Sequence, residues 1–74
     1  MEKTEFEDIY KELIREVSQE IRETKLEIKA LEKEALTGDK ENVKVYARFV
    51  NQYIKLNELL LKLIVDYVKV LEGE

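Results

Sequence analysis

The sequence contains no cysteine, histidine, proline or tryptophan, and only two glycines. Without cysteine, no disulfide can staple the 74 residues, and a chain this short usually needs such a staple or a partner to become stable. Histidine is the commonest general base and the commonest transition-metal ligand. Its absence, together with that of cysteine, argues against structural zinc and against the usual catalytic groups. We therefore expect no enzyme activity, no metal and no cofactor.

Long apolar runs are also missing. The most apolar window, residues 59–71, contains Lys62, Asp66 and Lys69, and no run approaches the roughly 18–20 uncharged residues of a membrane span. Residues 1–6 are polar and no short apolar core follows them, so we predict no signal peptide and a soluble, cytoplasmic protein. The abundant Glu, Lys, Ile and Val resemble the composition of proteins from hot environments.

One short segment, residues 37–39, interrupts an otherwise helical pattern. Gly38 suits the left-handed conformation that ends a helix, and Asp39 suits the N-cap of the next helix. A linker this short returns the chain antiparallel to itself. The sequence therefore predicts a hairpin that turns at Gly38.

Two helices of matching length flank this turn. We predict the first over about residues 4–36, beginning at a capping box of Thr4 and Glu7, and the second over about 40–72, where Gly73 ends it. Neither helix contains an internal proline or glycine, so each is about 50 Å long at about 1.5 Å per residue. The chain is thus predicted to be a single all-α hairpin domain, residues 1–74.

The second helix carries four apolar columns. With Val43 at position a of a heptad abcdefg, the a and d positions are Val43, Tyr46, Val50, Tyr53, Asn57, Leu60, Ile64, Tyr67 and Leu71. The e positions are Ala47, Ile54, Leu61 and Val68, and the g positions are Phe49, Leu56, Leu63 and Val70. One neighbouring helix covers the a and d columns, so four columns need neighbours on more than one side.

The first helix has a single apolar stripe and a charged opposite face, the pattern of an outer helix. The stripe contains Tyr10, Ile14, Val17, Ile21, Thr24, Ile28, Leu31 and Ala35, and it broadens at its ends through Phe6, Ile9, Leu13 and Leu36. Leu26 lies nearly opposite Ile28 on the helical wheel, where a single exposed leucine is ordinary.

Self-association is expected, because a lone hairpin leaves much of the e and g columns in water. Each large apolar side chain left exposed forgoes about 1.5–3 kcal/mol. The simplest closed solution is a two-fold homodimer with both copies of the second helix in the middle, an antiparallel four-helix bundle. A trimer or tetramer of hairpins, or docking on a larger protein, stays open. The predicted interface residues are Phe49, Tyr53, Ile54, Leu56, Asn57, Leu60, Leu61, Leu63, Ile64, Val68 and Val70.

Asn57 is the one polar residue in the a and d columns, and it lies beside the midpoint of its helix. In an antiparallel pair of second helices, each Asn57 would meet its own copy, and a buried amide pair disfavours other registers. Alternatively, the side chain binds a backbone carbonyl or lies at a wet edge. The four tyrosines, Tyr10, Tyr46, Tyr53 and Tyr67, are expected to pack their rings inside rather than to act in catalysis.

The f column of the second helix is wholly basic. It consists of Arg48, Lys55, Lys62 and Lys69, with Lys44 near its start. Charges spaced about 10.5 Å apart can meet nucleic-acid phosphates, an acidic protein or phospholipid. However, Glu58 and Asp66 adjoin the column and the net charge is −4, so a solvated helix edge is the simpler interpretation.

In plan and size the predicted hairpin resembles the plasmid RNA regulator called repressor of primer, a two-helix chain that dimerises into a four-helix bundle. No residue motif carries this resemblance, so the RNA-binding role is not transferred. Residues 60–67 are similar to the tail of small two-helix phosphatases that act on a sporulation response regulator, but Leu61 stands where that motif has an acidic residue. We predict a non-enzymatic interaction or oligomerisation module, with a small dimeric nucleic-acid-binding protein as the alternative.

Overall fold

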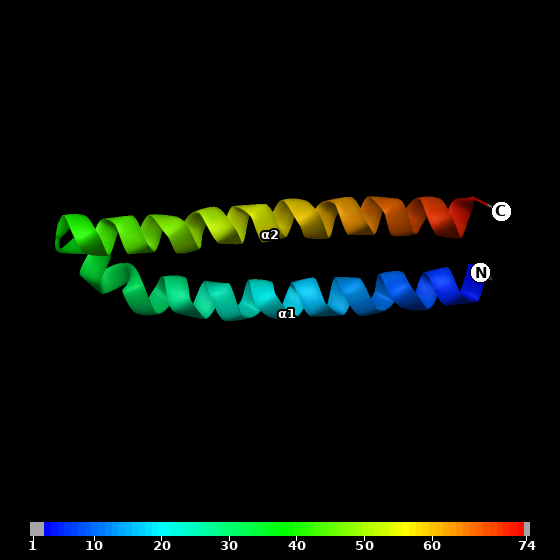
Figure 1. Ribbon diagram of the computed structural model, residues 1–74, viewed down its shortest axis with the longest axis horizontal. Helices are drawn as coiled ribbons and strands as arrows, with labels where there is room; N and C mark the ends of the chain where they lie inside the picture. The colour runs from blue at the N-terminus through cyan, green and yellow to red at the C-terminus, as the bar shows by residue number, and fades with distance from the viewer. Residues whose placement is uncertain (1–2, 74) are drawn as a thin grey trace.

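The computed structural model describes residues 3–73, and their side chains from residue 4 onward. Helix α1 spans Lys3–Leu36 and helix α2 spans Lys40–Glu72. Figure 1 shows the two helices side by side and antiparallel, with both ends of the chain at the same end of a rod. The rod measures 54 × 15 × 14 Å. The all-α hairpin is confirmed, and the predicted helix bounds agree with the observed ones to within one residue.

The turn follows the local chemistry of Gly38 and Asp39. Gly38 has a φ angle of 84°, the left-handed region that glycine enters without a steric penalty. Its N–H donates to the Ala35 carbonyl at 3.3 Å, which closes the last turn of α1. Asp39 is extended at φ −66° and ψ 121°, and its Oδ1 accepts from the Glu41 N–H at 2.9 Å. Both predictions for the turn are confirmed.

The C-terminal end of α2 lies where the sequence predicted it, whereas the N-terminal end of α1 does not. Gly73 caps α2, because its N–H donates to the Lys69 carbonyl at 2.8 Å and the helix ends at Glu72. The predicted start of α1 was one residue late. Lys3 is already helical, so Thr4 lies inside the first turn rather than at the cap.

Helix α1 presents the predicted stripe to α2. Seven of its eight residues are half-buried and the eighth, Thr24, is 6% exposed. At the open end of the hairpin, Tyr10 from this stripe stacks on Tyr67 of α2, with ring centroids 6.0 Å apart and an interplanar angle of 19°. Such an offset stack favours one position of α1 along α2.

Helix α2 packs on α1 through its d and g columns, rather than through the a and d columns that the heptad pattern predicted. We call these residues the packed seam, and all eight are half-buried: Tyr46, Phe49, Tyr53, Leu56, Leu60, Leu63, Tyr67 and Val70. These columns hold most of the large side chains of α2, so they bury more apolar area than the a column would. The d and g columns also contain no amide, whereas an a and d seam would have to desolvate Asn57.

Residues 4–73 of the hairpin form no hydrophobic core of their own. Among the side chains of residues 4–73, Thr24 is the only one that is buried, and no hydrophobic side chain is. Two helices in contact cover each other along one line only, so every packing side chain keeps part of its surface in water. The fold therefore leaves a large apolar area open to a further contact.

Candidate interaction surface

The a and e columns of α2 form a second apolar stripe, which α1 does not cover. We call it the free seam, and its nine residues follow 3-4 spacing over four heptads: Val43, Ala47, Val50, Ile54, Asn57, Leu61, Ile64, Val68 and Leu71. All but Val50 are exposed. The most exposed of its large hydrophobic side chains are Leu61 at 64% and Ile54 at 50%. At about 100° per residue, the free seam lies about 110° around α2 from the packed seam.

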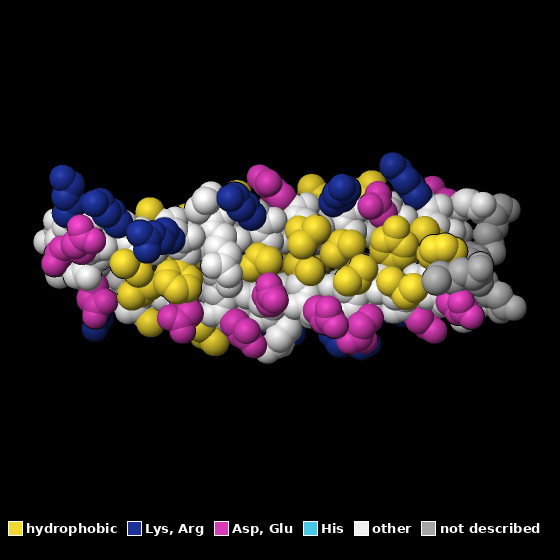
Figure 2. All heavy atoms as spheres, in the orientation of Figure 1, with side chains coloured by type: hydrophobic (Ala, Val, Ile, Leu, Met, Phe, Trp, Pro, Cys, Tyr) yellow, Lys and Arg dark blue, Asp and Glu magenta, His cyan; other side chains and the backbone are white. Residues whose placement is uncertain are grey.

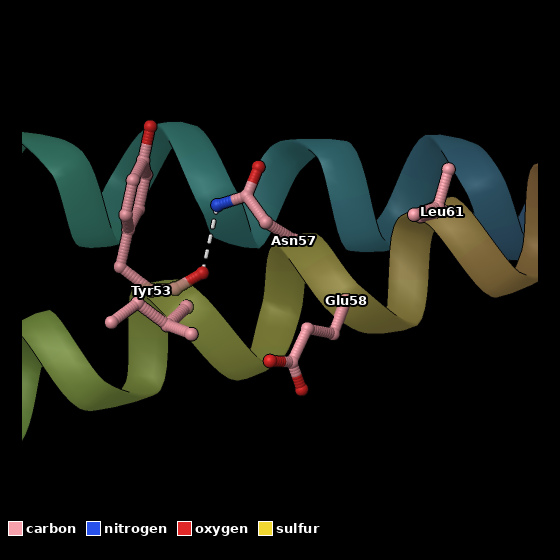
Figure 3. Close-up of a pocket in the computed structure, with 5 residues that line it drawn as sticks. Tyr53, Asn57, Glu58 and Leu61 are labelled. Carbon is pink, nitrogen blue, oxygen red and sulfur yellow. Dashed lines mark hydrogen bonds between the residues drawn. The ribbon is translucent and has the colours of Figure 1, made fainter.

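Side-chain packing hollows out the middle of the free seam. A hollow of about 340 Å³ is lined by Tyr53, Ile54, Asn57, Glu58 and Leu61. Figure 3 shows Tyr53, Asn57 and Leu61 on one side of α2, whereas Glu58 points away from them. A second hollow shares Tyr53 and extends to Lys25 and Ile28 of α1. Apolar side chains of another helix can enter such depressions as knobs enter holes.

Asn57 lies at the centre of this surface and is exposed. Its Nδ2 donates to the Tyr53 carbonyl oxygen, one turn earlier, at 2.7 Å (Figure 3). This bond matches the alternative in which Asn57 binds a backbone carbonyl. It uses one of the two amide protons and leaves Oδ1 as an acceptor. Pairing with a second Asn57 stays a prediction.

The predicted interface residues divide between the two seams of α2. Six of them lie in the packed seam, half-buried on the side of α1: Phe49, Tyr53, Leu56, Leu60, Leu63 and Val70. The other five lie exposed in the free seam: Ile54, Asn57, Leu61, Ile64 and Val68. Sequence reasoning did not single out the other four members of the free seam as interface residues, although their column positions mark them as members of this surface: Val43, Ala47, Val50 and Leu71.

Charged side chains line the edges of the rod. Figure 2 shows the broad face opposite to that of Figure 3, where hydrophobic side chains lie between mainly basic side chains along the α2 edge and mostly acidic side chains along the α1 edge. On α2, all four f-column residues are exposed. None of them forms an ion pair with another residue of the described chain, whereas Lys44 Nζ lies 3.6 Å from Glu41 Oε1.

Residues 3–73 contain no group of three or more acidic side chains placed to hold a metal ion. Neither α1 nor α2, as described, combines the length and apolarity needed to cross a membrane. No family model, curated protein or solved structure matches this chain.

Proposed function

We propose that this protein is a non-enzymatic interaction and oligomerisation module, and that the free seam of α2 is its contact surface. The simplest assembly is a homodimer in which two copies of α2 form the centre of a four-helix bundle. In that assembly each α2 has two neighbours, its own α1 and another helix.

The single observation that carries this proposal is the exposure of the free seam. Six of its large aliphatic side chains, between 41% and 64% exposed, lie in one straight stripe: Val43, Ile54, Leu61, Ile64, Val68 and Leu71. Scattered exposed hydrophobic residues are normal, but a contiguous apolar stripe marks an interaction site. The absence of any buried hydrophobic side chain among residues 4–73 adds to this, because a chain without a core cannot easily offset its conformational entropy alone.

Two leucines of nearly equal exposure provide the test. Leu61 in the free seam is 64% exposed, and Leu26 on the polar face of α1 is 67% exposed. If the exposed fraction of the leucine alone decided how a substitution changes self-association, Leu61→Glu and Leu26→Glu would change it equally. We expect Leu61→Glu to weaken self-association at least about 30-fold, equivalent to about 2 kcal/mol, because it places a carboxylate in the contact.

Sedimentation equilibrium of both variants, with far-UV circular dichroism as a check of helicity, gives the comparison. Leu26→Glu should associate like the unaltered chain. Equal association of the two variants, with helicity retained, would show that the free seam is not the contact surface.

A second candidate function is nucleic-acid binding. It is favoured by the f column of α2, which is exposed and forms no ion pair within residues 3–73. Such binding should weaken steeply with added salt, and Lys55→Glu with Lys62→Glu should weaken it further. The matched control is Lys25→Glu with Lys29→Glu, which makes the same charge change on α1. Binding that both double variants weaken equally would reflect overall charge rather than a site on α2.

A further inference from the structure

We infer that the occupant of the free seam is a second copy of this chain, with its α2 antiparallel to the first and the two-fold axis beside Asn57. This inference rests on the proposed function and adds the identity and orientation of the partner. Three features of α2 support it: the symmetry of the seam, the amide at its centre and the charges at its ends.

The free seam is centred on Asn57. Val50 and Ile64 lie seven residues from it on either side, and Val43 and Leu71 lie fourteen residues from it. An antiparallel copy therefore places Val43 opposite Leu71 and Val50 opposite Ile64, so that aliphatic side chains meet aliphatic side chains along the whole seam. Only at the axis does a polar side chain enter, and there it meets the same side chain.

The amide of Asn57 is suited to such a pair. Within residues 3–73, its bond to the Tyr53 carbonyl leaves Oδ1 and one N–H without a protein partner. Two amides that face each other across a two-fold axis can each donate this N–H to the other's Oδ1. An apolar helix from another protein would instead bury Oδ1 without a donor, which is unfavourable. The centre of the seam thus matches its own copy better than an all-apolar partner.

The charges that border the seam decide its orientation. Lys44 adjoins Val43 at one end and Glu72 adjoins Leu71 at the other, and both lie in the b column with Glu58 midway between them. An antiparallel copy brings Lys44 near the partner's Glu72 at both ends and leaves one like-charged pair, Glu58 with its copy. In a parallel two-fold pair the two b columns would lie on opposite sides of the contact, so neither Lys44 would reach the partner's Glu72. Ion pairs of this kind select orientation in helix bundles.

Single-cysteine variants test the geometry, because the chain has no cysteine of its own. A disulfide requires Cα atoms within about 7 Å. Oxidation of an equal mixture of Val43→Cys and Leu71→Cys chains should give mainly the mixed disulfide, and Asn57→Cys should link to itself. Val43→Cys alone should form little disulfide. Leu26→Cys on the polar face of α1 is the control and should stay unlinked.

A second test changes no seam residue. Lys44→Glu should weaken the dimer about 2- to 10-fold, and adding Glu72→Lys should restore its affinity, as expected for exposed ion pairs.

Efficient disulfide formation by Val43→Cys alone would overturn the antiparallel orientation while leaving the proposed function in place. A dimer by mass in which neither the mixture nor Asn57→Cys links would overturn the use of the free seam for self-pairing. A helical monomer would overturn both proposals.

Discussion

Gly38 is the residue on which the hairpin turn depends most directly. Its φ angle of 84° is the only positive one between residues 3 and 73. Apart from Gly38 itself and its two chain neighbours, no residue has an atom within 4 Å of the position that a Cβ would take. Any loss of stability on substitution therefore comes from the left-handed backbone conformation rather than from a steric clash.

We expect Gly38→Ala to lower the free energy of unfolding by roughly 1–2 kcal/mol, the penalty of the left-handed conformation for an L-residue. Gly38→Asn should cost less, because asparagine tolerates this conformation better. Urea unfolding at one fixed protein concentration measures both. Equal losses in the free energy of unfolding for the two substitutions would argue against a backbone-conformational origin of the loss.

Asn57 is the second residue with a distinct prediction. Asn57→Leu should raise the thermal midpoint, because an apolar side chain replaces an amide in the contact, and it should broaden the distribution of oligomer sizes. Gln52→Leu, which also replaces an exposed amide of α2 outside the free seam, should leave that distribution unchanged. Size-exclusion chromatography with light scattering measures both variants. A single unchanged species for Asn57→Leu would contradict a role of Asn57 in setting the assembly.

The residues that the sequence predicted well are those with local causes. Gly38 and Asp39 act through their own backbone and the next turn of the chain, so their roles follow from residue type and spacing. The hydrogen bond of Asn57 to Tyr53 was one of two alternatives, and residue type alone could not decide between them. Whether Asn57 binds only its own backbone or also pairs with a second Asn57 depends on whether another chain covers it.

At the scale of the helix, the face of α2 that contacts α1 was harder to predict than the residues at which α2 begins and ends. Helix α1 has one apolar stripe, so periodicity identified the residues that face α2. Helix α2 has four apolar columns, and the heptad pattern favoured a contact through the a and d columns over the other adjacent pairs. Side-chain size and the position of Asn57 select the d and g columns, and both are packing effects that a two-letter apolar and polar pattern does not contain.

The contact between α1 and α2 can be tested at the Tyr10 and Tyr67 stack. Tyr67→Ala should lower the free energy of unfolding by about 2 kcal/mol, roughly half the cost of removing a fully buried aromatic ring, because Tyr67 is only half-buried. Tyr67→Phe keeps the ring and should have little effect. Thermal unfolding followed by circular dichroism compares the two. A large loss in Tyr67→Phe would show that the hydroxyl, rather than ring packing, contributes the stability.

For the whole molecule, the sequence was sufficient to predict the all-α hairpin, its length and its turn, because the helical spacing is unbroken on both sides of residues 37–39. The arrangement of hairpins in an assembly is a different question. It depends on which apolar surface remains after α1 and α2 have packed, and the structure reduces that surface from four columns of α2 to two. An assembly held together by the free seam should also melt at a higher temperature as protein concentration increases.

The most direct test of the central claim is the mass of the unmodified chain in solution over a wide concentration range, measured by sedimentation equilibrium together with helicity. We predict a helical species of twice the chain mass of 8.8 kDa, which loses helicity as dilution dissociates it. A fully helical species that stays at 8.8 kDa at every concentration would contradict it.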